Sequence, residues 1–154
     1  MKRDFVKRSF TLLELIIVII IIGILAILGF TQYGRMVERS RGAEARAIIG
    51  DIRKMAYSFR LEQGSIATIA PANVNLCTGA IGQTGCIPAT ALGCAPSHFF
   101  SYGIVAAEPS ITITATRCVA GGKTPNITGA GQTLILTSNL LTGVDNPWAG
   151  AGGY

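Results

Sequence analysis

An uninterrupted apolar run near the N-terminus constrains this chain more than any other feature. Residues 9–30 read SFTLLELIIVIIIIGILAILGF, and Glu14 is the single charged residue among them. As a helix, the stretch from Phe10 to Phe30 would span roughly 32 Å, which matches the hydrocarbon thickness of a bilayer, about 30 Å. The run therefore predicts a helix that can cross a membrane.

The basic leader ahead of the run predicts its orientation. Residues 1–9 hold four Lys or Arg and one Asp, so they carry +3 of the chain's net charge of +5. Lys and Arg clustered before a hydrophobic stretch keep that end in the cytoplasm. The remaining +2 is spread over the rest of the chain and gives little support to nucleic acid as a partner.

Three interpretations compete for such a run. A secretory signal peptide would have a shorter apolar core followed by a small-x-small cleavage site. A single-pass anchor fits the length but leaves Glu14 unexplained, because an acid inside such a segment costs about 2.5–3.5 kcal/mol on insertion scales. In the third interpretation, a positive group from a neighbouring copy of the chain neutralises Glu14.

The start of the run resembles the class III signal peptide of type IV prepilins and type II secretion pseudopilins. In that family a basic leader ends at a small residue, usually Gly, and a dedicated prepilin peptidase removes it. The new N-terminal Phe is N-methylated and is followed by Thr-Leu and, at the fifth residue, Glu. The resemblance places the cut between Ser9 and Phe10, with Thr11, Leu12 and Glu14 in the matching positions. Ser9 is small but stands where the family usually has Gly.

The resemblance implies a function and a set of partners. Glu14 would pair with the methylated Phe10 amine of the adjacent subunit, since an uncompensated buried charge there would be strongly disfavoured. The chain would be the structural subunit of an extracellular type IV pilus, which serves adhesion, motility or DNA uptake. Its partners would be further copies of itself in a helical filament, the prepilin peptidase and methyltransferase, and the inner-membrane pilus assembly machinery. It would lie in the bacterial inner membrane as a single-pass prepilin and then on the cell surface.

Two other functions remain open. The segment 145–150, DNPWAG, faintly resembles the Asp-Pro-Trp-Gly segment near a Ca²⁺ site in major pseudopilins of type II secretion, which form a short periplasmic fibre. The four cysteines and the stretches HFFSYG and TATR look more like pilins. The third function is that of a single-pass anchored binding module that does not polymerise.

Residues 31–63 contain no Pro, and we expect the apolar helix to continue through them as an amphipathic helix ending at Gly64. The predicted apolar stripe recurs at helical spacing and consists of Ile48, Ile52, Met55 and Phe59. Arginines recur every seven residues on another face, at Arg39, Arg46, Arg53 and Arg60. We interpret this row as a solvated face, with contacts to acidic groups on adjacent subunits as the alternative.

Residues 64–97 are rich in Gly, Pro, Ala and Thr and predict a long connecting loop. An even number of cysteines behind a membrane-targeting segment favours disulfides in an oxidising compartment. A loop of this length needs fastening, which disulfides provide. We prefer the pairing Cys77–Cys86 and Cys94–Cys118, and the other two pairings remain compatible with the sequence.

Three β-rich stretches follow, at 98–106, 110–118 and 132–138, separated by turn residues. We expect them to form an antiparallel meander packed on the helix stripe, in a sheet of three to four strands. The fold class is therefore α+β and type IV pilin-like. The expected segments are the leader 1–9, the assembly half of the helix 10–30, its amphipathic half 31–63, the loop 64–97, and the sheet and tail 98–154.

The residues give no sign of an enzyme. His98 is the only histidine, and beside two Phe residues it is better explained as a structural residue than as a base. Paired carboxylates, a phosphate-binding Gly loop and metal-ligand spacings are absent from the sequence. We therefore expect no catalytic residue, no metal site and no cofactor.

Overall fold

The computed structural model describes residues 10–77, 86–88, 94–123 and 131–150. The chain divides into two units, one up to Glu38 and one from Arg39 onward. The leader 1–9 lies outside the described residues.

The helix α1 runs from Leu12 to Gln63 and crosses the boundary between the two units. The absence of Pro and the abundance of Leu, Ile, Ala, Arg and Glu favour a long helix. It ends where Gly64 adopts a left-handed backbone with φ of 75°, and the Gly64 N–H donates to the Arg60 carbonyl at 2.8 Å. The predicted long helix is confirmed, as is the Gly64 cap.

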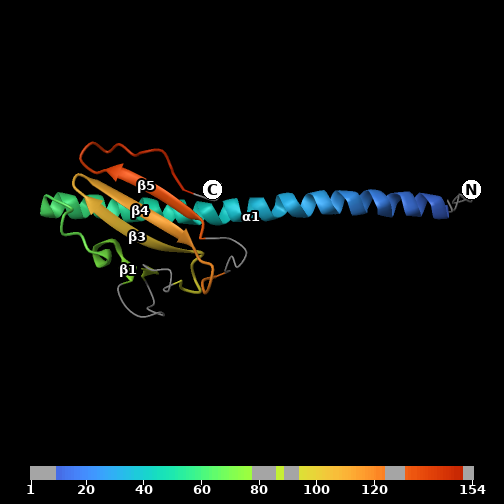
Figure 1. The fold of residues 1–154 in the computed structure, drawn as a ribbon, viewed down its shortest axis with the longest axis horizontal. Helices are drawn as coiled ribbons and strands as arrows, with labels where there is room; N and C mark the ends of the chain where they lie inside the picture. Colours follow the sequence, from blue (N-terminus) through green and yellow to red (C-terminus); the bar gives the residue numbers. More distant parts are fainter. Residues whose placement is uncertain (1–9, 78–85, 89–93, 124–130, 151–154) are drawn as a thin grey trace, which may run out of the picture. The chain divides into compact units, whose positions relative to one another are not determined.

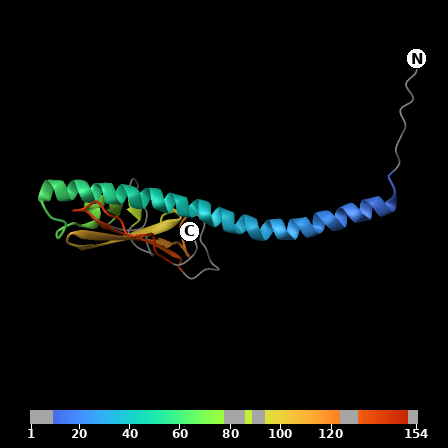
Figure 2. The same cartoon turned by 90° about the horizontal axis from the view of Figure 1, so that it is seen from above.

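The three predicted strands form the main sheet of the second unit. They are β3 (Phe100–Ala107), β4 (Ser110–Arg117) and β5 (Thr133–Asn139), paired antiparallel in that order. Along β4 the buried and half-buried residues alternate, so that Ile111 and Ile113 face the core. Figure 1 shows the three strands lying beside the second half of α1, and Figure 2 shows the sheet on one side of that helix. The predicted α+β arrangement of helix and antiparallel sheet is confirmed.

The helix face that packs on the sheet differs from the predicted stripe. Its fully buried residues are Ala45, Ile49, Ile52 and Ala56. Of the predicted stripe, Ile52 is central, Ile48 and Met55 pack at the margin, and Phe59 is half-buried. The buried face is therefore rotated from the predicted stripe, and two of its four fully buried positions, Ala45 and Ala56, carry small apolar side chains.

The segment after the helix contains more regular structure than the predicted loop. It holds a 3₁₀ helix, η1 (Pro71–Val74), and two short parallel strands, β1 (Leu76–Cys77) and β2 (Ile87–Pro88). Ile66, Val74 and Leu76 are buried in the core of the sheet unit. The segment is therefore packed onto the domain by apolar side chains as well as by disulfides.

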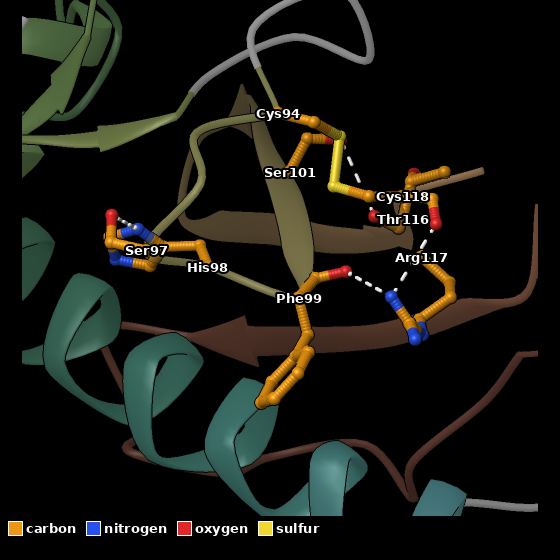
Figure 3. The surroundings of a disulfide bond; sticks show 8 residues. All are labelled: Cys94, Ser97, His98, Phe99, Ser101, Thr116, Arg117 and Cys118. Carbon is orange, nitrogen blue, oxygen red and sulfur yellow. Dashed lines mark hydrogen bonds between the residues drawn. A yellow bond between two sulfur atoms is a disulfide. The ribbon is translucent and has the colours of Figure 1, made fainter. Parts of the chain in front are cut away.

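Two disulfides close this part of the chain, joining Cys77 to Cys86 and Cys94 to Cys118. This is the pairing that the sequence analysis preferred. Figure 3 shows Cys118 beside Arg117, which is fully buried. The Arg117 guanidinium donates to the Phe99 carbonyl at 2.9 Å and lies over the Phe99 ring at 5.5 Å. Buried charge is tolerated there because carbonyl oxygens and aromatic rings surround the guanidinium.

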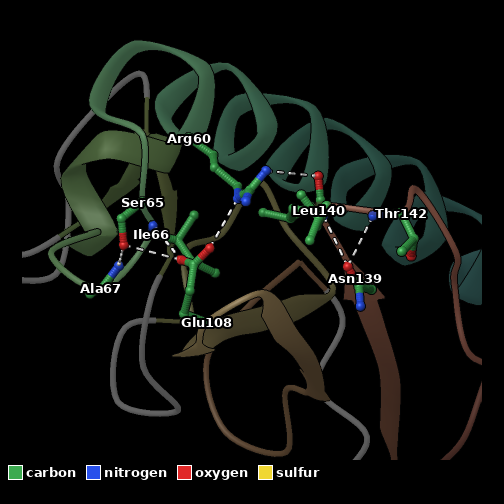
Figure 4. Close-up of polar contacts among 9 residues, drawn as sticks. Arg60, Ser65, Ile66, Ala67, Glu108, Asn139, Leu140 and Thr142 are labelled. Atoms are coloured by element: carbon green, nitrogen blue, oxygen red, sulfur yellow. Dashed lines mark hydrogen bonds and ion pairs between the residues drawn. The ribbon is translucent and has the colours of Figure 1, made fainter.

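The turn between β3 and β4 carries Glu108, which holds the end of α1 in place (Figure 4). Its carboxylate accepts from the Ile66 N–H at 2.8 Å, from Arg60 Nε at 3.1 Å and from Ser65 Oγ at 3.1 Å. The Ile66 N–H and the Arg60 side chain lower the pKa of Glu108 below its ordinary value. The charged form of Glu108 is therefore the one that the folded domain favours.

Three of the four heptad arginines contact the chain's own C-terminal segment, which corrects the interpretation of a solvated face for them, whereas Arg39 is exposed. Arg46 lies over the Trp148 ring at 5.8 Å. Arg53 Nε contacts Asp145 Oδ1 at 3.0 Å and Ser138 Oγ at 2.9 Å. Arg60 donates to the Leu140 carbonyl at 3.5 Å. Three arginines spaced by two helical turns thus hold the segment 140–148 along the helix.

The same C-terminal segment pairs with the outer edge of β5. Ala149 and Ile135 exchange two backbone hydrogen bonds, at 2.7 and 3.0 Å, and the Asn146 N–H donates to the Thr137 carbonyl at 2.8 Å. Gly150 follows with φ of 139°, and a Cβ there would collide with the Thr133 carbonyl. The close approach of tail and strand therefore requires Gly at this position.

Replacing Ile52 by Ala should destabilise the sheet unit by about 2–5 kcal/mol, because it removes a fully buried side chain from the helix–sheet interface. Urea titration of the full chain in detergent micelles, followed by Trp148 fluorescence, measures the change. The matched control is Leu61→Ala on the exposed side of the same helix, which should leave the midpoint almost unchanged. Equal losses for both variants would contradict the observed packing.

Replacing Glu108 by Gln should lower stability at neutral pH and remove a pH dependence. Since the folded state lowers the pKa of Glu108, its stabilisation is present above the ordinary pKa of 4.5 and is lost as pH falls through the folded value. Urea midpoints measured from pH 7 to pH 3 should fall more steeply for the wild type than for Glu108→Gln. Glu62→Gln, at an exposed position near the helix end, is the control. Parallel curves for the wild type and Glu108→Gln would refute this role for Glu108.

Candidate assembly segment

The segment Phe10–Phe30 lies in the first unit, and every one of its residues is exposed. Among the described residues, α1 is long and apolar enough to cross a membrane, and its most apolar window is buried nowhere in the chain. A helix that is apolar around its whole circumference is stable only inside a protein core or a membrane. The described residues provide no such surroundings for this segment, which favours lipid or other molecules as its cover.

The first turn of α1 is capped by Thr11. The Thr11 hydroxyl accepts a hydrogen bond from the Glu14 N–H at 3.2 Å, and the Thr11 carbonyl accepts from the Leu15 N–H at 3.3 Å. This is one half of the capping box that Thr-x-x-Glu sequences form. The cap was not predicted, although the spacing of Thr11 and Glu14 is a known sequence signal for it.

Glu14 stands at the third position of the helix, where a negative charge is favourable to the helix dipole. Its side chain is exposed, as is that of Phe10, of which 75% is accessible. The expected ion pair joins the Glu14 carboxylate of one copy to the Phe10 amine of another copy. The structure of a single chain therefore does not test it. Ser9 lies outside the described residues, and cleavage after it and methylation of Phe10 stay predictions.

The other two residues considered for chemistry, His98 and Asp145, both contact neighbouring groups of the protein. His98 Nδ1 lies 2.8 Å from Ser97 Oγ, and the His98 backbone bonds to Ala95 and Lys123. Asp145, which the sequence comparison with pseudopilins singled out, is paired with Arg53. Within the part of the chain that the structure describes, no group of three or more His, Cys, Asp or Glu residues converges on a point that would hold a metal ion.

The Thr11 cap leads to a direct prediction. Thr11→Ala should remove the side-chain acceptor at a cost of about 1 kcal/mol, which corresponds to roughly fivefold faster exchange of the Glu14 amide. Thr11→Ser keeps the hydroxyl and should exchange like the wild type. Hydrogen exchange of the full chain in detergent micelles, read by NMR or mass spectrometry, provides the comparison. If Ala and Ser variants exchanged at the same rate, the hydroxyl would have no capping role.

Comparison with known protein families finds a motif at the start of the chain. The family model described as the prokaryotic N-terminal methylation motif matches residues 5–30, and the rest of the chain lies outside that match. No solved structure matches the chain. Proteins with this motif are structural subunits that a prepilin peptidase processes and that assemble into a pilus or pseudopilus. The chain therefore carries the prokaryotic N-terminal methylation motif, the class III signal peptide of type IV pilins and pseudopilins.

Proposed function

We propose that this chain is the structural subunit of an extracellular type IV pilus. In this proposal the prepilin is cut between Ser9 and Phe10, the Phe10 amine is methylated, and the mature subunit polymerises through Phe10–Phe30. The chain would have no catalytic activity of its own. Its partners would be further copies of itself, the peptidase and methyltransferase, and the assembly machinery of the inner membrane.

The observation that carries the proposal is the complete exposure of the apolar segment. Burying an apolar group is favourable by about 0.8 kcal/mol per CH₂, so a helix of this composition cannot remain in water. The bilayer covers it before assembly. In a filament the same surface would be covered by the equivalent helices of neighbouring subunits, so extraction from the membrane need not expose it.

Glu14 supports polymerisation rather than simple anchoring. The Thr11 cap uses the Glu14 backbone N–H and leaves the carboxylate at an exposed position of an apolar helix. In a filament core that carboxylate would need a positive partner, because an unpaired buried charge is strongly destabilising. The methylated amine of Phe10 in the next subunit would provide it and would thereby set the register between subunits.

The alternative is the major pseudopilin of type II secretion, which would assemble through the same segment. The tail resemblance to the pseudopilin Ca²⁺ region gains no support from the described residues, since Asp145 pairs with Arg53 there. The two disulfides and the HFFSYG stretch favour a pilin. Filaments on the cell surface would favour the pilus, whereas a fibre confined to the periplasm would favour the pseudopilus.

Replacing Glu14 by Ala should abolish filaments while leaving the protein in the membrane fraction. The substitution removes the carboxylate that would neutralise the neighbouring amine, but it makes the helix more apolar and so does not impair insertion. Electron microscopy of sheared cell surfaces measures filaments, and fractionation measures membrane retention. Mass spectrometry of wild-type filaments should find an N-methylated Phe10 at the N-terminus.

Leu13→Ala is the matched control, because it changes the adjacent exposed position without touching the carboxylate. Its filaments should persist. Abundant filaments from Glu14→Ala would refute the role of this carboxylate. A wild-type chain that stayed in the membrane fraction and never formed filaments would instead favour the anchored binding module.

A further inference from the structure

The face of the main sheet that points away from α1 has an unusual composition (Figure 2). Within β3, β4 and β5 the one charged residue is Arg117, and it is buried on the helix side of the sheet. Strand pairing places the outward side chains in rows that cross the three strands. We call two adjacent rows the outer face, and they consist of Gly103, Thr114 and Ile135 in one row and Val105, Thr112 and Thr137 in the other.

The outer face has a projecting side chain next to an empty position. Val105 is 67% exposed, although it lies within a strand. Gly103 stands two positions earlier on the same strand, so it belongs to the same face. A Cβ added at Gly103 would meet no atom within 4 Å. The surface therefore rises at Val105 and is open at Gly103.

The hydroxyl groups of the outer face do not prevent it from being covered. Thr112 Oγ1 and Thr137 Oγ1 lie 3.1 Å apart across the two strands and share a hydrogen bond. Covering a polar group is costly mainly when the group is left without a partner, and these two hydroxyls supply one to each other. The threonine methyl groups, Val105 and Ile135 add apolar surface. The outer face is therefore suited to contact with another uncharged surface.

We propose that the outer face binds the outer face of a second copy of this chain in a neighbouring filament. This inference rests on the proposed function. The chain carries a net positive charge, so two copies repel each other and approach best where neither presents a charge. Contact between identical faces closes after two copies, whereas a helical filament repeats a contact between different surfaces. The outer face therefore joins two filaments and does not build either of them.

The pattern of the two rows is self-complementary. A two-fold axis perpendicular to the strands, passing at Ile104, sets β3 of one copy against β3 of the other in antiparallel orientation. Val105 of each copy then faces Gly103 of the other. The same rotation sets the rest of each row against the other row, because the strands are paired in register. The projecting side chain of one copy thus fills the empty position of its partner.

The size of the sheet determines where this contact is observed. Three strands of about eight residues present a face of about 14 Å by 25 Å. This is less than half of the ~800 Å² per partner that a stable complex buries. A filament repeats the face along its length, and such multivalency raises the apparent affinity by about 10²–10⁴. Filaments should therefore bundle, whereas subunits in detergent should not form dimers through this face.

Exchanging the projecting and the empty position tests the proposal. Gly103→Val should reduce the fraction of filaments in bundles at least tenfold, because two valines then collide, and filament yield should not change, because the position is open within one chain. The double variant Gly103→Val with Val105→Gly should restore bundling, since it only exchanges the two positions. Electron microscopy of sheared filaments at equal protein concentration gives the bundled fraction for each variant.

A mixing experiment tests the same contact through charge. Filaments of Thr114→Lys should remain single, as should filaments of Thr114→Glu, because each variant brings like charges together across the contact. A mixture of the two preformed filaments should bundle, because opposite charges then face each other. Thr68→Lys is the matched control, at an exposed threonine outside the sheet, and its filaments should bundle as the wild type does.

The two hypotheses fail in different ways. The outer-face contact would be overturned by wild-type filaments that do not bundle, by Gly103→Val filaments that bundle normally, or by mixed filaments that stay single, and each result would leave the proposed pilus function intact. If Gly103→Val formed no filaments, the mixing experiment would decide alone. A wild-type chain that forms no filaments would overturn the proposed function, and the outer-face contact with it.

Discussion

The rest of this structure depends on one constraint, which is that the apolar surface of the helix segment Phe10–Phe30 must be kept from water. From Phe10 to Phe30 every side chain is exposed in the described part of the chain, and the one charge in this segment, on Glu14, lies where the helix begins. Neither lipid nor a neighbouring helix is part of the folded unit, so the native environment of this segment is always another molecule.

The second unit has a small sheet, so packing on the helix and disulfides are both important to its stability. Three strands bury their apolar face on Ala45, Ile49, Ile52 and Ala56, and two disulfides restrict the connecting segments. A core of this size is marginal by itself, so polar contacts at its margins gain importance. Glu108 ties the helix end to the β3–β4 turn, and the spaced arginines tie the C-terminal segment to the helix.

Periodic patterns in the sequence predicted the main elements well because each is set locally. The alternation of Ile and Thr in β4 follows from the strand geometry, and the helix end at Gly64 follows from the left-handed backbone there. The phase of the buried helix face could not be predicted, because Ala45 and Ala56 are buried through the fit to the sheet rather than through their hydrophobicity. The contacts of Arg46, Arg53 and Arg60 with the segment 138–148 join residues that are distant in the chain, and only tertiary structure reveals them. A turn between the stretches 98–106 and 110–118 was predicted, but the bonds of Glu108 in that turn to Arg60 and Ile66 likewise depend on the folded arrangement.

The pairing of the C-terminal tail with β5 also determines whether the edge of the sheet can pair with a strand of another molecule. A bare edge strand offers unpaired N–H and C=O groups on which a foreign strand can form, which is how native proteins aggregate into cross-β material. Here the outward backbone groups of Ile135, Thr137 and Asn139 are already bonded to the tail. In a filament, neighbouring subunits that lie side by side could otherwise pair through their β5 edges. The paired tail therefore protects the edge of β5 from amyloid-like association with other strands.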